Sequence, residues 1–344
     1  MSNALGKLRS ASVTDLIGLS LVGLVLVWLA INFVKEPADF INIALIGLTN
    51  GTIFGIVALG YTLVYGILQL INFAHGDVFA LSGLVASTVI VSVLGLDEGA
   101  SVMFIIVGLA FTLVVIMGGF ALFNASIERV AYKPLRSAPR LAPLITAIGV
   151  SFIVQNIALA IYGVNYQTVP NFIPRTDVIS IGSISYSWSK ASVLIIVIPL
   201  LLVLSWFVSS TKQGKAMRAV AQDTEASAMM GIDVNRTISV TFLLAGALAG
   251  AAGIIYLLQF NMRYDTGFEL GLIAFTAAVL GGIGNLTGAV VGALIIGFIQ
   301  AFNEGLGWFA PGSDWTRTMV FGILILILVF RPEGILGEQT PEGA

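Results

Sequence analysis

The sequence predicts an all-α protein that crosses a membrane about ten times, within a range of eight to ten. Three observations lead to this fold class: 58% of the residues are apolar, only 10% are charged, and the mean hydropathy is +1.01. Soluble domains carry roughly 25% charged residues, so an ordinary soluble fold is excluded. A chain of 344 residues with this composition is expected to place one apolar helix after another across a bilayer.

Ten apolar segments mark the expected membrane helices. They cover residues 16–34, 41–71, 78–96, 101–123, 144–163, 191–209, 238–260, 270–284, 288–303 and 316–330. The first is longer than the roughly 7–15 residues of a signal-peptide core, so we expect it to be kept as a helix. The second has 31 residues and would be about 46 Å long, against a bilayer core of about 30 Å. It must therefore tilt, protrude or break, and Gly60 and Gly66 are places where a break is allowed.

The basic residues predict the orientation of the chain, because Lys and Arg in short loops stay on the cytoplasmic side. With a cytoplasmic N-terminus, ten crossings place eleven basic residues inside and five outside. The inside set is Lys7, Arg9, Arg129, Lys133, Arg136, Arg140, Lys212, Lys215, Arg218, Arg236 and Arg331, and the outside set is Lys35, Arg175, Lys190, Arg263 and Arg317. Both termini and the loops 128–143 and 211–236 are therefore expected in the cytoplasm.

The longest external loop, residues 164–190, contains a run in which polar and apolar residues alternate about Gly182 and Ser183. This pattern predicts a short β-hairpin near residues 179–188. The aromatic residues of this region are expected in the membrane-interface belt, and a docking surface for an external protein is the alternative. They are Tyr162, Tyr166, Tyr186 and Trp188.

Glycine spacing repeats at an offset of 237 residues, since Gly47, Gly51, Gly55 and Gly60 recur as Gly284, Gly288, Gly292 and Gly297. The expected topology runs these two segments in opposite directions, so an inverted repeat is one interpretation. Close helix packing in lipid selects the same small-residue spacing and is the other.

The most polar part of the membrane region is the stretch 66–77, where the second apolar segment ends. The candidate translocation-path residues are Asn50, Gln69, Asn72, His75 and Asp77. If the chain breaks here, these side chains line or flank a pathway, because irregular backbone in a membrane needs a wet or protein-lined cavity. Alternatively, His75 and Asp77 only mark the turn between the second and third helices.

Residues 211–236 form a charged island between two apolar segments. Seven charged residues fall within it: Lys212, Lys215, Arg218, Asp223, Glu225, Asp233 and Arg236. Asp223 is placed to cap a short helix over residues 224–230, Gly231 suits the left-handed residue that ends it, and Asp233 is placed to cap the next helix.

Several chemistries are excluded. The absence of Cys removes disulfides and thiolate ligands, and a single His leaves little for a transition metal. Gly214 and Lys215 are followed by Ala216, so the phosphate-binding G-x-x-x-x-G-K-[ST] loop is missing, and no H-E-x-x-H or G-x-S-x-G motif occurs. We expect no catalytic residues, no metal site and no cofactor in this chain, and a net charge of −2 implies no general attraction to nucleic acid.

Four blocks of the sequence resemble the LivH-type branched-chain amino acid permeases, which are integral subunits of ABC importers. The blocks are 47–78, beginning GLTNGTIFG; 225–231, EASAMMG, which is similar to the EAA---G coupling motif; 281–292, GGIGNLTGAVVG; and 330–336, FRPEGIL. One departure is Ser227, where the general motif has a second Ala. The resemblance covers about residues 41–336, preceded by a tail and extra helix at 1–40 and followed by a tail at 337–344.

The resemblance implies an ABC importer permease fold in a bacterial plasma membrane. Its partners would be two cytoplasmic ATP-binding subunits, a second, related permease chain and an extracytoplasmic solute-binding protein. It places coupling to the ATPase in the charged island, at Glu225, Ala226 and Gly231 of the motif. We add Asp223 and Arg218, which precede the motif in the island, as further candidate coupling residues.

The resemblance leaves the substrate less well defined than the coupling. It implies a branched-chain or other hydrophobic amino acid, with urea or short amides as the alternative within the family. An ion-coupled secondary transporter or channel is the alternative of another class, which the lack of an intramembrane carboxylate array disfavours.

Overall fold

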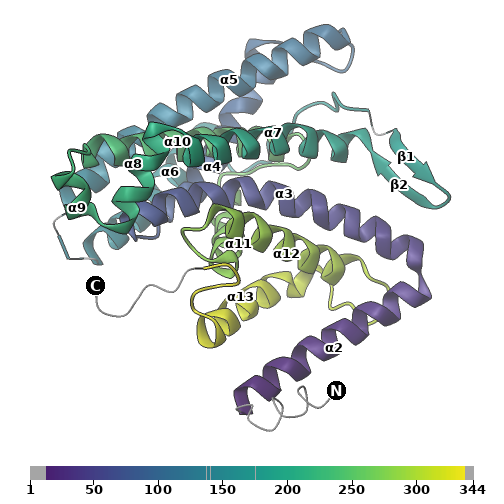
Figure 1. The fold of residues 1–344 in the computed structure, drawn as a ribbon. Helices are drawn as coiled ribbons and strands as arrows, with labels where there is room; N and C mark the ends of the chain where they lie inside the picture. The colour runs from purple at the N-terminus through teal and green to yellow at the C-terminus, as the bar shows by residue number, and fades with distance from the viewer. Residues whose placement is uncertain (1–12, 137, 140, 175, 338–344) are drawn as a thin grey trace.

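The computed structural model describes residues 13–136, 138–139, 141–174 and 176–337. Lys7, Arg9, Arg140 and Arg175 of the orientation count, and the tail from residue 338 onward, lie outside the described residues. Within them the chain is an α-helical bundle with one two-stranded sheet (Figure 1), as predicted.

Eight helical segments of the described chain are long and apolar enough to cross a membrane. They are α3 (Pro37–Leu68), α4 (Ala74–Thr88) with the π-helical η1 (Val89–Val93), α5 (Val102–Ile127) with η2 (Glu128–Tyr132) and η3 (Lys133–Leu135), α6 (Leu141–Tyr162), α7 (Trp188–Ser210), α10 (Val234–Leu257), α12 (Leu286–Gly305) and α13 (Ser313–Phe330). Two shorter apolar helices are α11 (Thr266–Gly281) and the part Val22–Lys35 of α2 (Val13–Lys35). All ten predicted segments therefore fall on apolar helices.

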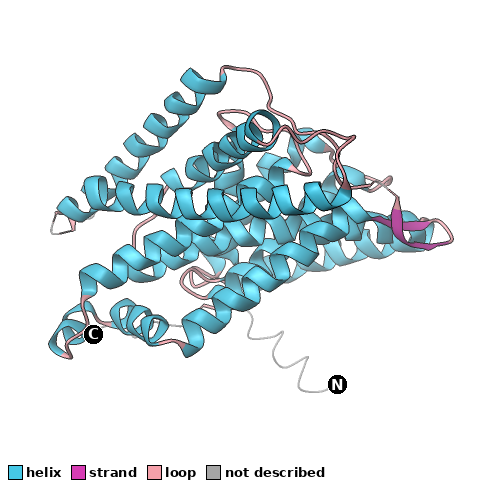
Figure 2. Cartoon of the chain, turned by 90° about the horizontal axis from the view of Figure 1, so that it is seen from above, coloured by secondary structure: helices cyan, strands magenta, loops and turns pink. Residues whose placement is uncertain are grey.

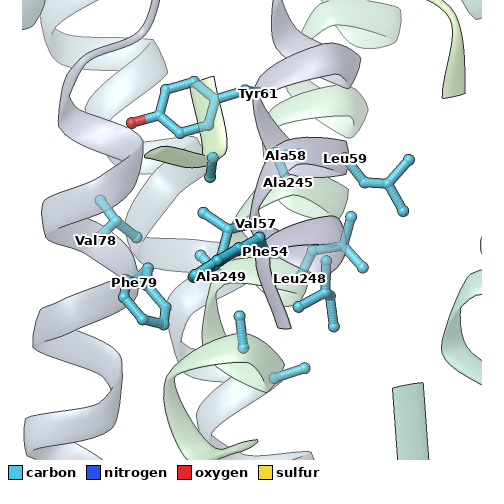
Figure 3. Packing of buried hydrophobic residues seen from close by; sticks show 14 of the residues in the cluster. Phe54, Val57, Ala58, Leu59, Tyr61, Val78, Phe79, Ala245, Leu248 and Ala249 are labelled. Atoms are coloured by element: carbon cyan, nitrogen blue, oxygen red, sulfur yellow. The ribbon is translucent and has the colours of Figure 1, made fainter. Parts of the chain in front are cut away.

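The core is built from α3, α4 and α10. Between 67% and 72% of the apolar window of each of these helices is buried, against 11% to 22% for α5, α6, α7 and α13. Figure 3 shows Val57 of α3, Phe79 of α4 and Ala249 of α10 in this core, and none of them is more than 2% exposed. The outer helices expose their apolar side chains instead, as helices that face lipid do.

Helix α3 passes through Gly60 and Gly66 without interruption, so of the three alternatives a break at either glycine is excluded. The helix ends at Leu68, and Gln69 follows in the left-handed conformation with φ 50°. A helix of 32 residues is about 48 Å long, which leaves tilting or protrusion from a core of about 30 Å. The His75 side chain of α4 lies beside Gly60, and Gly284, in the loop between α11 and α12, lies beside Gly66.

The loops gather at two ends of the molecule. The short helices α8 (Lys212–Gln222) and α9 (Thr224–Met229) lie at one end and the hairpin of β1 (Asp177–Ile181) and β2 (Ile184–Ser187) at the other (Figures 1 and 2). We call these the α8–α9 end and the hairpin end. Of the described basic residues, Arg129, Lys133, Arg136, Lys212, Lys215, Arg218, Arg236 and Arg331 belong to the α8–α9 end, and Lys35, Lys190, Arg263 and Arg317 to the hairpin end. This asymmetry supports a cytoplasmic α8–α9 end.

The predicted hairpin is confirmed, with Ile181 paired to Ile184 around the turn. Asn42 of α3 fastens the turn, because its side chain donates to the Ser183 carbonyl and accepts from the Ser185 N–H, both at 2.9 Å. The Tyr186 hydroxyl lies 2.9 Å from the Thr49 hydroxyl, and burial raises the pKa of Tyr186 above its ordinary value. The hairpin is therefore anchored to α3, and Trp188 begins α7 instead of continuing the strand.

The repeated glycines have a packing role, because α3 and α12 run antiparallel in contact. A Cβ at Gly51 would lie 2.8 Å from the Cα of Leu294, and one at Gly297 would overlap the Gly51 backbone. At the other end of this contact, Gly284 lies beside Gly66. Small residues let the two backbones approach, as close packing in lipid requires. The packing interpretation is confirmed, while the inverted repeat stays a prediction.

Substituting Gly297 should loosen the contact between α3 and α12. We expect Gly297→Leu to lower the heat-unfolding midpoint in detergent, since overpacking costs about 1–3 kcal/mol. Gly322→Leu on α13 is the matched control, because a Cβ at Gly322 meets nothing within 4 Å. Circular dichroism of the two purified variants makes the comparison, and equal midpoints would contradict this account.

Candidate functional site

Two helices begin within the charged island at the aspartate caps that its sequence predicts: α9 at Asp223 and α10 at Asp233. The N–H of Ala226 donates to Asp223 at 2.8 Å, and the N–H of Arg236 donates to Asp233 at 3.0 Å, so both aspartates cap helices. Helix α9 ends at Met229, one residue earlier than expected, and Gly231 follows with φ 84°. A side-chain cap therefore fixes the first residue of both α9 and α10, and the left-handed Gly231 turns the chain away after α9 ends.

Helix α8 is fixed to the end of α7. A Cβ at Gly214 would overlap the carbonyls of Phe207 and Val208, so only glycine lets the two backbones approach so closely. The guanidinium of Arg218 donates to the carbonyls of Val208 and Ser209 and satisfies the end of α7. Arg218, predicted as a coupling residue, thus holds α8 against α7.

The outer surface of α9 combines an acidic and an apolar part. Glu225 is exposed, and Met229 and Met230 are 82% and 83% exposed. Ala226 is half-buried and Ser227 is buried against the rest of the chain. Sequence reasoning missed the two methionines, although adjacent apolar residues in a charged loop were a usable signal. Flexible methionines suit a surface that binds a partner.

The five candidate path residues do not form one site. Asn50 lies half-buried on α3, and Gln69, 19 residues later, lies exposed at the end of that helix, about 28 Å away along the axis. Asn72, His75 and Asp77 are buried, at 2%, 0% and 1% exposure. His75 and Asp77 lie in the first turn of α4, directly after the turn that follows α3, so both the pathway role and the turn role stay predictions.

His75 and Asp77 face different helices. The His75 ring packs against Gly60 of α3 and makes an edge contact with Tyr61, with ring centroids 4.9 Å apart. The Val57 carbonyl faces this ring, yet neither ring nitrogen has a partner with hydrogen-bond geometry. Asp77 accepts from Ser151 and, at 3.0 Å, from Gln155, both on α6. The two residues are therefore not an acid–base pair.

Asn72 connects the turn after α3 to η2. The Tyr132 hydroxyl donates to the side-chain oxygen of Asn72 at 2.7 Å, and both residues are buried. The cavity beside Asn72, which is also lined by Tyr61 and Phe275, measures about 10 Å³. This volume holds about one water molecule and is far too small for a solute such as an amino acid.

The other end of η2 is tied to α10. Glu128, only 1% exposed, accepts from the Arg136 guanidinium and, at 2.8 Å, from the Ser239 hydroxyl. Arg136 also donates to Asn235, in the first turn of α10. Residues 128–136 therefore link the helix after α9 to the turn after α3. Sequence reasoning missed Glu128 and Tyr132 in this role, because their partners are distant in the chain.

A much larger cavity, about 760 Å³, opens at the hairpin end. The loop between α10 and α11 and the ends of α11, α12 and α13 provide most of its lining. Its charged residues are Arg263, Asp265, Glu269, Glu304, Asp314 and Arg317. None of the candidate path residues lines it, and its lining comes from several elements that the sequence does not bring together.

The apolar spans around a buried core define a polytopic integral membrane protein. The chain belongs to the family of branched-chain amino acid transport system permease components, whose family model matches residues 43–329. The match begins after α2, in agreement with the less family-like first 40 residues. The resemblance predicted from the four sequence blocks is thus confirmed.

Two named relatives are similar over most of their length. BraD of Pseudomonas aeruginosa, a high-affinity branched-chain amino acid transport system permease protein, is 37% identical over 302 residues, covering 86% of this chain and 95% of the relative. LivH of Escherichia coli K12 carries the same description and is 35% identical over 303 residues, with the same coverage. Among solved structures, PsaBC from Streptococcus pneumoniae in complex with Fab has a TM-score of 0.42 and 13% identity over 88% of this chain and 95% of that chain, too distant to add to the assignment.

Gly60 should be required because His75 occupies the space beside it. A Cβ at Gly60 would overlap the His75 ring, so Gly60→Ala should lower the heat-unfolding midpoint. Gly55→Ala is the control, since its Cβ would meet Ala293 at an ordinary 3.7 Å. The destabilisation in Gly60→Ala/His75→Ala should be smaller than the sum of the two single effects. Additive effects in this double-mutant cycle would show that the two positions do not interact.

Proposed function

We propose that this chain is a permease subunit of an ATP-driven ABC importer for branched-chain or other hydrophobic amino acids. It forms half of the translocation path with a second, related permease chain. Two cytoplasmic ATP-binding subunits hydrolyse ATP, so the chain itself is not an enzyme and needs no cofactor. An extracytoplasmic solute-binding protein delivers the substrate. The single observation that carries this proposal is the capped, exposed helix α9 mounted on α8.

The geometry of the α8–α9 end suits a lever. Met217 and Val220 of α8 are buried at 3% and 1% exposure, so this helix moves with its neighbours. Asp233 joins α9 to α10 through a capped start, and Arg218 joins α8 to α7. A force applied to Glu225, Met229 and Met230 by a closing ATPase dimer would therefore reach both α7 and α10. If α7 and α10 have two arrangements that differ by a few kcal/mol in free energy, this force would shift the equilibrium between them.

Residues 128–136 extend this connection. Asn235 and Ser239 of α10 hold Arg136 and Glu128, and Tyr132 holds Asn72 after α3. A shift of α10 is thereby passed to the junction of α3 and α4, the two helices at the centre of the bundle. The coupling end and the core would then change together.

The orientation and division of the chain follow from the same proposal. The α8–α9 end faces the cytoplasm of a bacterial cell, the protein lies in the plasma membrane, and both termini are cytoplasmic. Residues 41–336 form the permease domain with its coupling loop at 211–236, and residues 1–40 add a tail and an extra helix. Residues 337–344 form the C-terminal tail.

Proteoliposomes test the proposal. The chain is reconstituted with a second permease, an ATPase pair and a solute-binding protein of the proposed importer, and uptake of leucine and of urea is measured with ATP inside. We expect ATP-dependent leucine uptake. Uptake driven by a proton or sodium gradient without ATP would overturn the class of transporter, and ATP-dependent uptake of urea alone would overturn the substrate.

Disrupting α9 should uncouple the importer. We expect Glu225→Lys and Gly231→Pro to reduce ATP-dependent uptake more than tenfold while membrane insertion is kept, because the first reverses a charge on the exposed face and the second cannot adopt φ 84°. The ATPase should co-purify poorly with Glu225→Lys. Asp39→Lys, the same charge reversal at the hairpin end, should retain the ATPase. Normal uptake in both α9 variants would refute the lever.

Tyr132→Phe should weaken the coupling of α10 to the junction of α3 and α4 without releasing the ATPase. The change leaves Asn72 without its donor, which costs about 1–3 kcal/mol at a buried site. We expect the ratio of leucine imported to ATP hydrolysed to fall several-fold, measured in proteoliposomes, with co-purification unchanged. Tyr162→Phe, which removes an exposed hydroxyl contact to Thr88 at the hairpin end, is the matched control. An unchanged ratio of leucine imported to ATP hydrolysed would show that η2 has no role in coupling.

A further inference from the structure

The cavity at the hairpin end has the size of a small-molecule site. Its volume of about 760 Å³ falls within the roughly 300–1,000 Å³ of typical ligand pockets. It lies at the opposite end of the molecule from α8 and α9, which is the side where a solute arrives if α9 meets a cytoplasmic ATPase. Nothing in the family description assigns a ligand to these residues.

Charges of both signs line this cavity. Arg263 pairs with Asp265 through two contacts of 2.6 Å, and Arg317 of α13 pairs with Glu269 of α11 at 2.6 and 2.7 Å. The side chains of the second pair are 68% and 45% exposed. Exposed pairs of this kind contribute little to stability, so a ligand carboxylate can replace Glu269 on the Arg317 guanidinium. That guanidinium offers the fork geometry that carboxylates prefer.

The opposite charge is available on α12. Glu304 accepts from the Thr316 hydroxyl at 2.8 Å and from the Gln300 amide at 3.1 Å, which are neutral donors that hold the carboxylate in place. Asp314 adds a second carboxylate to the lining. With four carboxylates and two guanidinium groups, the cavity has a surplus of negative charge that favours an ammonium group. The described residues contain no cluster of three or more His, Cys, Asp or Glu side chains placed to hold a metal ion.

Part of the lining is apolar. Leu270 is half-buried and Ile273 is 5% exposed, and both belong to α11 between the charged groups and the core. Tyr166 and Tyr256 add aromatic rings, and Arg263 lies 5.1 Å from the Tyr166 ring centre. Leu270 and Ile273 therefore offer an aliphatic side chain an apolar surface within an otherwise polar cavity.

We propose that this cavity is an outer binding site for a zwitterionic amino acid with an apolar side chain. The ligand carboxylate binds Arg317, the ammonium group binds Glu304, and the side chain lies on Leu270 and Ile273. The inference rests on the proposed import function and adds the place and the charge pattern by which the solute is recognised.

The absence of cysteine allows a direct test. Ser313→Cys places a single thiol in the cavity lining, and Ser183→Cys places one at the exposed hairpin turn as a control. The rate at which a small, neutral thiol reagent labels this chain is measured by mass spectrometry in the reconstituted importer. The probes are leucine, an analogue of leucine that lacks the carboxylate, one that lacks the amine, and urea. Asn261→Cys serves in the same way if Ser313→Cys does not fold.

We expect leucine to slow labelling in the cavity several-fold and to leave the hairpin control unchanged, with neither analogue nor urea giving protection. Adding Arg317→Gln or Glu304→Gln to the reporter should raise the leucine concentration for half-protection at least tenfold. Labelling that leucine does not slow, or protection that either analogue matches, would overturn the site. Because labelling reports binding and not import, an importer that takes up leucine with ATP but shows no protection refutes this site alone. A failure of ATP-dependent import refutes the proposed function instead.

Discussion

Close contact between glycine backbones is the constraint on which the rest of the structure depends. Helices in lipid gain no hydrophobic advantage from association, so they rely on van der Waals packing, which needs close approach. Gly51 and Gly297 bring α3 against α12, and a Cβ at Gly271 of α11 would lie 3.0 Å from the Cα of Gly76 on α4. These contacts fix the spacing of the central helices. Any change that opens the bundle must therefore move whole helices, because interfaces packed in this way do not deform gradually.

The buried polar residues are part of the same packing. His75 fits only because Gly60 has no Cβ, and Asp77 is held by Ser151 and Gln155 of α6. Polar groups within a membrane are costly unless they find partners, and those of Asp77 come from another helix. The polar run after α3 therefore joins α4 to α3 and α6 in this arrangement of the chain.

Local features of the sequence predicted local structure well. Asp223, Gly231 and Asp233 act on residues within four positions of themselves, so the caps and the end of α9 could be read from the chain. The hairpin was predicted for the same reason. The continuity of α3 through Gly60 was not, because the side chain that fills the space beside this glycine lies 15 residues away in α4.

The candidate site shows the same difference between local features, which the sequence predicts, and contacts between distant residues, which it does not. Tyr132 meets Asn72 across 60 residues, and Arg317 meets Glu269 across 48, and no short pattern marks such pairs. The family resemblance predicts coupling residues in the charged island but gives no position for a ligand. Asn50 and Gln69 were predicted to line one path with His75, whereas the long helix α3 carries Asn50 and Gln69 far apart.

The difference between the two cavities bears on how a solute passes. The one among the buried helices measures about 10 Å³, and the one at the hairpin end about 760 Å³. Val57, Val78 and Ala249, at the contact of α3, α4 and α10, are no more than 2% exposed, so this part of the chain is closed. A solute held by Arg317 and Glu304 would then have to advance along the side of the bundle. A path with one wall from each of two permeases meets this requirement. In such a path the solute moves through a groove that neither chain encloses alone. Moving α7 and α10 at one end would widen or narrow that groove, which explains why coupling should act on whole helices.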